Sequence, residues 1–587
     1  MIKTKLLFMW IALAALVVGC APAPSRSGAG DDPGGQPRAA APKTLTMAVE
    51  NEPKFLAAGF GDSSADKAAS NLRLALSQRL ATFDDRGELL PMLAVELPSQ
   101  ERGTWVVRPD GTMQTTYRLQ PGVTWHDGAP LTSADVALGW RVMGDKDFGL
   151  SVSAVTRLIT TIDTPDDSTF VMEWASPYPS ANAIVSDDVG PLPAHLLGEQ
   201  YQREKDRLMD HPYLSHEFVG LGPYRLSEWE RGSHLVLKAY DGFYGGRAKI
   251  DTLIVRFIPN PSTAVANLLS GVVDGILPRT LDFTQAMFVK DEWARTGKHP
   301  VAIAQPTHWR QVYVQFNDPR PVELLDVRTR RAALYALDRQ GLVDTLFAGQ
   351  SQVSDTFFPP DDVKWDWVKD VIARYPYDQR RALDLFGQVG WTRGSDGLLT
   401  NAAGERVTFA LWTTLGAQYE QEMAIMGDSW KAVGITVDPL IQTQAQNADK
   451  KFVASFPSFN PSQIPIKQDQ VLARVYGPNC ATEENRWNGN NRGCSSVPSL
   501  DRANEALQTA IDPVRVRELY RDFNRMLTEE LPVLPLYFSV QVVLFREGVT
   551  NQNYVNQRAI ARRAARHSIH TSRRAKLQAA TRKVATT

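Results

Sequence analysis

The sequence contains only three cysteines, and no apolar run reaches the ~20 residues that a helix needs to cross a bilayer. It also lacks the glycine-rich loop ending in Lys and Ser or Thr that binds nucleotide phosphates, and no serine sits in a nucleophile elbow. His216 and Glu217 begin like a zinc-protease motif, but the second histidine is missing. These absences argue against an ATPase, a serine hydrolase and a zinc protease.

The amino-terminal residues have the pattern of a secretion signal. Lys3 and Lys5 precede an apolar run of about 13 residues from Leu6 to Val18, which suits a secretion signal and is too short to span a membrane. The pattern predicts a signal peptide over residues 1–19. Cys20 comes directly after it.

Residues 17–20, Val-Val-Gly-Cys, resemble the lipobox of bacterial lipoproteins. The resemblance implies that Cys20 is lipidated and becomes the mature amino terminus, and several acyl chains on one residue anchor a protein durably. Residues 21–42 are almost entirely Ala, Pro, Ser and Gly with a few charges, a composition that cannot bury enough apolar surface to fold. We therefore expect a disordered tether over residues 20–42. The alternative is a soluble secreted protein with a coincidental cysteine.

The net charge of −1 conceals an uneven distribution. Residues 557–587 carry nine Lys or Arg and no acid, and residues 1–19 carry two Lys and no acid, which leaves about −12 for residues 20–556. An acidic body argues against nucleic acid as a partner, because phosphate binding needs clustered basic residues. The basic tail is a membrane-surface helix, a protein-specific extension or the product of a reading-frame error.

With Cys20 assigned to lipid, Cys480 and Cys494 remain. In an oxidising compartment two thiols so close in sequence favour a disulfide, which would stabilise the fold by about 3 kcal/mol. Two buried free thiols are the alternative.

Local patterns predict a mixed α/β body. Alternating residues predict a strand over Thr44–Val49 and a hairpin from 105–107 and 115–119. Helical spacing with capping signals predicts helices over 65–80, 133–143, 327–347 and 514–529. Asp84 to Gly87 read as a turn, and a strand begins over Val533–Phe538.

The segment from Arg118 to Val136, with Trp125, His126 and Asp127 at its centre, closely resembles the signature of the family 5 extracellular solute-binding proteins. These are the oligopeptide, dipeptide and nickel binders of bacterial ABC importers. Further blocks resemble the family in the same order, at 222–224, 244–261, 271–274, 326–349, 377–391 and 529–537. The resemblance covers most of the chain from Leu45 to Gly548.

The resemblance implies an α/β, two-lobed clamp like that of periplasmic binding proteins, hinged by two interlobe crossings. The first lobe is expected to be discontinuous, over residues 43–302 and 531–556, and the second to span 303–530. It also implies that His126 and Asp127 form a structural turn and are neither metal ligands nor an acid–base pair. No cofactor and no metal site are expected.

Six residues are predicted to contact ligand because a cleft for an organic solute needs aromatic walls and a few polar groups. By position in the family they are Glu52, Trp412, Phe456, Phe459, Trp487 and Asn488. For each aromatic, core packing is the alternative.

Peptide binders often place an aspartate in the 456–469 region to pair with the ligand's amino group, whereas Ser458 to Ile466 is uncharged here. A neutral or larger solute is therefore also plausible.

The leading hypothesis is a monomeric, lipid-anchored extracytoplasmic receptor that passes a peptide or similar solute to the permease and ATPase of an ABC importer. A second hypothesis is a clamp protein that signals to a membrane sensor or acts like a chaperone. A third is an extracellular hydrolase, for which the sequence shows no nucleophile and base.

Overall fold

A computed structural model describes residues 42–549 apart from 58–59, 61–66, 84–87, 149, 151–153, 185–188 and 467. The predicted signal peptide, Cys20, the tether up to residue 41, the turn at 84–87 and the basic tail 557–587 lie outside the described residues. Within the described part of the chain, no helix combines the length and the apolar character needed to cross a membrane.

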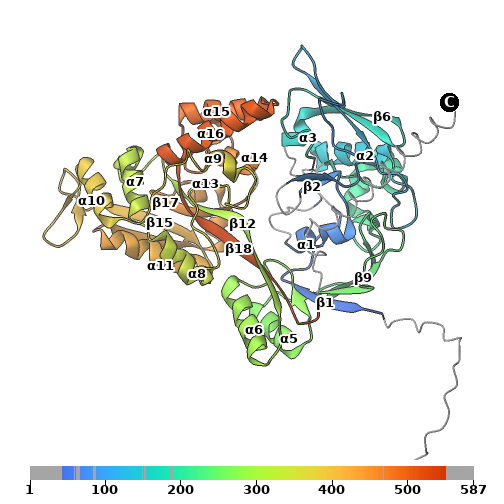
Figure 1. Cartoon of the computed structure of the whole chain (residues 1–587), viewed down its shortest axis with the longest axis horizontal. Helices are drawn as coiled ribbons and strands as arrows, with labels where there is room; N and C mark the ends of the chain where they lie inside the picture. The colour runs from blue at the N-terminus through green and yellow to red at the C-terminus, as the bar shows by residue number, and fades with distance from the viewer. Residues whose placement is uncertain are drawn as a thin grey trace, which may run out of the picture. The chain divides into compact units, whose positions relative to one another are not determined.

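A ten-stranded sheet runs through the described chain in the order β16-β15-β17-β12-β18-β11-β1-β10-β9-β8 (Figure 1). Its strands are β1 (Thr44–Val49), β8 (Tyr224–Glu230), β9 (His234–Ala239), β10 (Thr252–Phe257), β11 (Gly275–Ile276), β12 (Val301–Val314), β15 (Thr408–Thr414), β16 (Thr436–Gln442), β17 (Phe459–Pro465) and β18 (Val533–Phe545). The predicted first strand is confirmed as β1, which pairs in parallel with both β10 and β11. Leu45 and Met47 join one apolar core and Ala48 joins another, so both faces of β1 are buried.

A separate four-stranded sheet has the order β4-β5-β7-β6. It consists of β4 (Trp105–Val107), β5 (Met113–Arg118), β6 (Ile159–Asp166) and β7 (Thr169–Trp174). The predicted hairpin is confirmed by the antiparallel pairing of β4 with β5. Two small sheets pair β2 (Ala81–Phe83) with β3 (Leu89–Pro91) and β13 (Thr392–Arg393) with β14 (Leu399–Thr400).

The α-helices are α1 (Lys67–Leu76), α2 (Ser133–Gly144), α3 (Ala154–Leu158), α4 (Ala194–Arg203), α5 (Pro261–Ser270), α6 (Phe283–Arg295), α7 (Val327–Tyr335), α8 (Arg339–Phe347), α9 (Trp365–Val368), α10 (Gln379–Gln388), α11 (Ala417–Ala432), α12 (Gln444–Ala448), α13 (Lys450–Ala454), α14 (Gln468–Arg474), α15 (Pro498–Thr509) and α16 (Pro513–Glu530). The helix predicted over 65–80 already ends at Leu76, whose carbonyl accepts a hydrogen bond from the Gly222 N–H (3.0 Å). The helix predicted over 514–529 is confirmed as α16.

The capping signal at Thr132 is confirmed at the start of α2, and Asp135 does more than the sequence suggested. Its carboxylate accepts from the Thr132 N–H (2.8 Å), from the Trp125 indole (3.2 Å) and from the Ala194 N–H at the start of α4 (2.7 Å). One buried carboxylate therefore satisfies donors from three segments, which fixes α2 against its neighbours.

Two long strands, β12 and β18, connect the halves of the large sheet. They pair antiparallel from Val301↔Phe545 to Tyr313↔Val533, with irregularities after Pro306 and after Arg310. The later part of β12 also pairs with β17, whereas the end of β18 pairs with β11. In Figure 1 the red β18 runs beside the green β12. The strand predicted over 533–538 is thus seven residues longer, because Ser539–Phe545 pair with the first part of β12, and the last two of them also pair with β11.

The single helix predicted over 327–347 is wrong. The chain forms α7 and α8, and the Asp338 carboxylate between them caps α8 by accepting from the Gly341 N–H (2.8 Å). The helical spacing misleads because both segments carry apolar residues at similar spacing, whereas the break depends on contacts that Arg339 makes elsewhere in the fold. α8 ends at Phe347, with Ala348 as its C-cap, and the next residue, Gly349, takes the positive φ angle (72°) that suits a C′ glycine.

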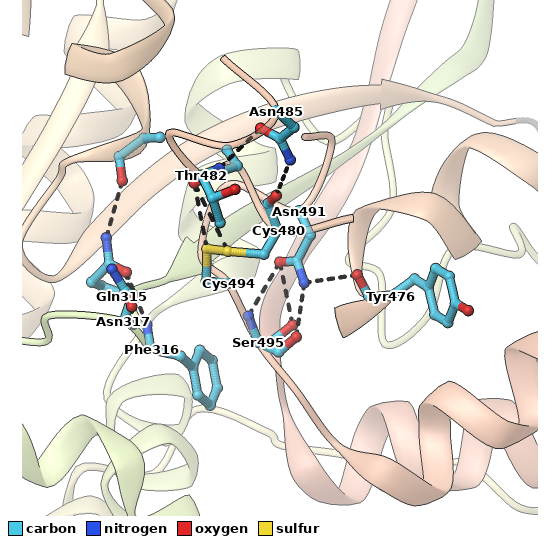
Figure 2. The surroundings of a disulfide bond; sticks show 12 residues. Gln315, Phe316, Asn317, Tyr476, Cys480, Thr482, Asn485, Asn491, Cys494 and Ser495 are labelled. Carbon is cyan, nitrogen blue, oxygen red and sulfur yellow. Dashed lines mark hydrogen bonds between the residues drawn. A yellow bond between two sulfur atoms is a disulfide. The ribbon is translucent and has the colours of Figure 1, made fainter. Parts of the chain in front are cut away.

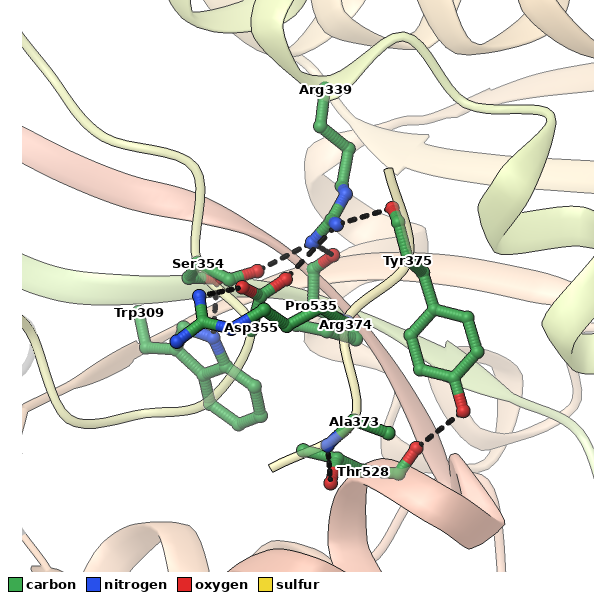
Figure 3. Close-up of polar contacts among 9 residues, drawn as sticks. All are labelled: Trp309, Arg339, Ser354, Asp355, Ala373, Arg374, Tyr375, Thr528 and Pro535. Atoms are coloured by element: carbon green, nitrogen blue, oxygen red, sulfur yellow. Dashed lines mark hydrogen bonds and ion pairs between the residues drawn. The ribbon is translucent and has the colours of Figure 1, made fainter. Parts of the chain in front are cut away.

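The break places Arg339 in the interior, where its side chain is only 5% exposed. The guanidinium donates to the carbonyls of Ser354 (2.6 Å) and Tyr375 (2.7 Å) and to the Asp355 carboxylate (3.1 Å), as Figure 3 shows. A continuous helix through 336–338 would change the direction of this side chain. The arginine thus ties α8 to the two segments that carry Asp355 and Tyr375.

A buried ion pair and a tyrosine hydroxyl link the two long strands, β12 and β18, to α11. Arg310 of β12 donates to the Glu422 carboxylate through Nε (2.8 Å) and an Nη (2.7 Å), and their side chains are 4% and 0% exposed. The Tyr537 hydroxyl of β18 donates to the same carboxylate. Burial by itself lowers the pKa of Arg310, but the neighbouring carboxylate outweighs it and the pKa is raised.

Candidate functional site

The short helix α13 brings together predicted ligand residues from distant segments. The Trp412 ring of β15 stacks on the Phe452 ring of α13, with centroids 4.9 Å apart and planes 20° from parallel. On the same helix, Lys451 Nζ lies 5.8 Å from the centroid of the Trp487 ring. Trp412, Phe452 and Trp487 are all half-buried, so each keeps part of its ring at the surface.

One hydrogen bond joins Asn488 to this helix, and a second holds it within its own loop. Lys450 donates to its side-chain oxygen, and its own amide donates to the Asn485 carbonyl (3.0 Å). Asn488 remains exposed. We call Trp412, Lys451, Phe452, Trp487 and Asn488 the α13 surface; it offers flat apolar area with polar groups at its edge, as an organic solute requires.

The loop that carries Trp487 and Asn488 is closed by a disulfide. The structure joins Cys480 to Cys494 with Cα atoms 4.6 Å apart (Figure 2). Asn485 braces the loop by donating to the Cys480 carbonyl (2.6 Å), and Asn491 does so by donating to the Ser495 carbonyl (2.8 Å). These bonds hold the two ends of the loop together.

In the same loop, three residues other than glycine have a positive φ angle: Arg486 (53°), Trp487 (59°) and Cys494 (53°). Each such residue costs on the order of 1–3 kcal/mol and persists only where the surroundings impose it. The closed loop supplies that constraint and holds the Trp487 ring toward α13.

We predict that replacing both Cys480 and Cys494 with serine lowers the free energy of unfolding by about 3 kcal/mol, because the unfolded chain loses its closed loop. Urea titrations of wild type with and without reductant should reproduce the loss. The double variant should not respond to reductant. If both cysteines of denatured, unreduced wild type react with an alkylating agent, the bond is absent.

Phe456 and Phe459 are buried rather than surface residues. Phe456 is 0% exposed, and its carbonyl accepts from the Gln315 amide (2.8 Å). Phe459 is also 0% exposed and packs between Phe409 and Trp430, with centroids 4.9 and 4.7 Å away. In this conformation both support the fold beneath the surface and offer no area to a ligand.

Glu52 contacts none of the α13 surface residues and is fully engaged elsewhere in the described chain. Its carboxylate accepts from the Trp229 indole (2.8 Å), from an Arg231 guanidinium nitrogen (3.2 Å) and from the Gly232 N–H (3.0 Å). The Arg231 guanidinium in turn lies 3.9 Å from the Trp229 ring centroid. The carboxylate thus stabilises a turn, and a ligand amine would have to displace these donors.

His126 and Asp127 form the expected structural turn. His126 Nδ1 accepts from the Gly220 N–H (3.0 Å), so Nε2 carries the proton and donates to the Gly222 carbonyl (2.9 Å). Burial lowers the pKa of His126 to about 4, which keeps the ring neutral. Asp127 contacts His195 Nε2 at 2.8 Å. Among the residues that the structure describes, no group of three or more His, Cys, Asp or Glu could hold a metal ion.

Sequence reasoning missed Phe452, Lys450 and Lys451. A signal was available, because Asp449 caps α13 by accepting from the N–H groups of Lys451 and Phe452 (3.0 and 3.1 Å). That cap predicts a helix start at residue 450. That α13 lies beside Trp412, Trp487 and Asn488, however, depends on tertiary contacts.

Comparisons with known proteins identify the family of this chain. The model of the bacterial extracellular solute-binding proteins, family 5 middle region, matches residues 101–479. The oligopeptide-binding protein AppA of Bacillus subtilis is 25% identical over 380 residues, which cover 64% of this chain and 65% of AppA. The match thus spans just under two thirds of that relative's length. Protein XP55 of Streptomyces lividans is 27% identical over 84% of this chain and 82% of its own.

Solved structures share the fold. AppA in complex with a nonapeptide aligns with a TM-score of 0.64 and 19% identity, covering 89% of this chain and 98% of its own. NikA from Brucella suis in complex with Fe(III)-EDTA aligns with a TM-score of 0.69 and 16% identity, covering 86% and 96%. These likenesses confirm the α/β, two-lobed clamp.

The family model covers well over half of the chain, and the block at 118–136, which closely resembles the family signature, falls inside the matched region, as does the block at 326–349. The chain belongs to the bacterial extracellular solute-binding proteins of family 5.

Proposed function

We propose that this protein is the solute receptor of an ABC importer and that the α13 surface contributes to its ligand site. The observation that carries the proposal is the convergence of Trp412, Phe452 and Trp487 on one short helix in a chain of this family. AppA is named for oligopeptides, which favours a peptide or a similar organic solute as the cargo.

The proposed clamp has a first lobe of residues 43–302 and 531–556 and a second lobe of residues 303–530. Support comes from β12, which runs across the boundary at residues 302–303, and from β18, which begins just after residue 531 and pairs with β12 along its length. Ligand binding would shift the population from open to closed by the difference in its affinity for the two states. The importer's permease would recognise the closed conformation, and its ATPase would supply the energy for transport.

We also propose that the mature chain is a monomer anchored through lipid on Cys20, with residues 21–42 as its tether. The lipobox-like residues 17–20 support this anchor. Replacing Cys20 with serine should release the protein from the membrane fraction, and an unchanged membrane fraction would remove the anchor from the proposal.

The test of receptor function is a thermal-shift screen of peptides, sugars and metal chelates, followed by calorimetry on the hits. A ligand at 100 times its dissociation constant should stabilise the protein by about 2.7 kcal/mol. Replacing Trp412 with alanine should weaken binding at least about tenfold, because the solute loses an aromatic wall.

The control is Trp140→Ala in α2, a half-buried tryptophan whose indole donates to the Thr156 carbonyl (3.3 Å). It should lower stability without changing affinity. The α13 surface is the wrong site if both variants bind equally well. No shift with any solute class would count against a receptor.

A further inference from the structure

One asparagine of the disulfide-closed loop stands directly before a glycine. Asn488 and Gly489 form the only Asn-Gly pair in the sequence, and Asn488 is exposed at the edge of the α13 surface. The main-chain nitrogen that follows an asparagine can attack the side-chain amide and close a five-membered ring. Because glycine has no Cβ to hinder that nitrogen, an Asn-Gly pair reacts more readily in this way than other asparagines do.

The main chain distinguishes Asn488 from the other exposed asparagines of the loop, Asn485 and Asn490. The nitrogens that follow those two residues donate to main-chain carbonyls, both at 3.0 Å. For the Gly489 N–H, no acceptor is found in the part of the chain that the structure describes. A nitrogen without an acceptor is free to lose its proton and to turn toward the side chain, whereas a bonded one must first give up its hydrogen bond.

The side-chain amide of Asn488 is polarised by a neighbouring charge. Lys450 of α13 donates to its Oδ1, and its Nδ2 donates to the Asn485 carbonyl (3.0 Å). An ammonium group on the oxygen draws electrons from the amide carbon and stabilises the negative charge that develops on this oxygen during attack. The side-chain oxygen of Asn485 accepts instead from the uncharged Thr482 N–H (3.0 Å), as Figure 2 shows.

We propose that Asn488 is a site of spontaneous deamidation assisted by Lys450. The Gly489 nitrogen gives up its proton and forms a bond to the Asn488 Cγ, the Cγ–Nδ2 bond breaks, and ammonia leaves with that proton. The resulting succinimide takes up one water, which opens either of its two C–N bonds. The products are aspartate and isoaspartate at position 488, and the reaction consumes only water.

The isoaspartate product does not fit the loop as it is packed. It adds one carbon to the main chain between Asn488 and Gly489. Gly489 is enclosed there, since a Cβ on it would lie 2.4 Å from both the Ala481 nitrogen and the Asn479 oxygen. The lengthened chain must therefore displace this segment, which also carries Trp487. The reaction thus ages the protein at the α13 surface; only its effect on ligand binding rests on the proposed receptor function.

The test follows full-length wild type, incubated at neutral and at mildly alkaline pH, by trypsin digestion and mass spectrometry. Cleavage after Arg486 and Arg492 releases the peptide 487–492, which contains both Asn488 and Asn490, and samples digested before incubation correct for conversion during handling. Asn488 should convert about tenfold faster than Asn490, because the nitrogen after Asn490 must break a hydrogen bond first. Conversion should be faster at the higher pH, since the attacking nitrogen loses a proton. Equal rates at the two positions would overturn the proposal.

Two lysine variants test the assistance by Lys450. Lys450→Met removes the ammonium group from Oδ1 and should slow the conversion of Asn488 about 3- to 10-fold in the folded protein. In urea, where the contact is lost, Lys450→Met and wild type should convert at the same rate. The matched control is Lys451→Met, because Lys451 Nζ lies near the Trp487 ring instead, 5.8 Å from its centroid. This control should convert like wild type. Equal rates for folded wild type and Lys450→Met would contradict the role of the lysine.

A second measurement tests the packing of the product. Incubation should lower the thermal midpoint of wild type further than that of Asn488→Gln, because glutamine would need a six-membered ring and keeps its amide. The two proteins share every other asparagine, so the difference reports position 488. An equal midpoint for wild type that has accumulated isoaspartate would overturn the packing argument. Neither measurement uses a solute, so failure of the receptor function and failure of this inference are distinguishable.

Discussion

Replacing Glu422 with glutamine is expected to lower the free energy of unfolding by about 3–5 kcal/mol, because the change leaves the Arg310 charge buried without a partner. Glutamine keeps the shape of the side chain, so the loss reports charge rather than packing. The pair is 4% and 0% exposed, and the Tyr537 hydroxyl shares the carboxylate. Chemical denaturation followed by tryptophan fluorescence measures the effect.

A surface pair of similar geometry provides the control. Arg108 donates to both oxygens of Glu173 (2.6 and 2.8 Å), but the two side chains are 35% and 25% exposed. Glu173→Gln should therefore change stability little, since solvent screens such pairs. A double variant, Arg310→Met with Glu422→Leu, should recover much of the stability lost by Glu422→Gln. Equal losses for Glu422→Gln and Glu173→Gln would contradict the assignment of a buried charge pair.

Stability should fall steeply as the pH drops from 6.5 to 4. Burial lowers the pKa of His126 and of His308 to about 4 in the folded protein, whereas an unfolded histidine titrates near 6.5. Between these values the unfolded chain binds protons that the folded chain does not, so acid favours unfolding. Each histidine contributes up to about 3 kcal/mol, fully present above pH 6.5 and lost on approaching pH 4.

Urea titrations at pH 7.5, 5.5 and 4.5 measure this loss. His126→Gln, which cannot gain the proton, should lose less stability between pH 7.5 and 4.5 than wild type does. The exposed His216 provides the control, and His216→Gln should follow the wild-type curve. Asp135 acts in the opposite direction because burial raises its pKa, so the comparison of variants isolates the histidine. Parallel curves for wild type and His126→Gln would show that His126 titrates freely in the folded state.

Local signals in the sequence were enough for elements whose ends are set by nearby residues. Alternation along Thr44–Val49 and the hairpin at β4 and β5 depend on side chains within each segment. The cap of α2 depends on Thr132 and Asp135, three residues apart. The ordered family blocks likewise depend on short stretches, which is why the family could be recognised from the sequence.

Long-range contacts explain where sequence reasoning fell short. The break between α7 and α8 results from the burial of Arg339 against the carbonyls of Ser354 and Tyr375. The extension of β18 to Phe545 needs β12, more than 230 residues earlier in the chain, as a pairing partner. The Asp338 cap of α8 is local, but the contacts of Arg339 with Ser354 and Tyr375 and the pairing of β18 lie outside any short stretch of sequence.

For the site, the sequence by itself determined the family, the aromatic candidates Trp412 and Trp487, and the cysteine pair that the structure joins. Only the tertiary structure decided that Phe456 and Phe459 are buried, that Glu52 is held by donors about 180 residues away, and that α13 gathers the surface aromatics. The physical reason is that residue type sets what a side chain can do, whereas exposure and partners depend on which distant segments pack around it.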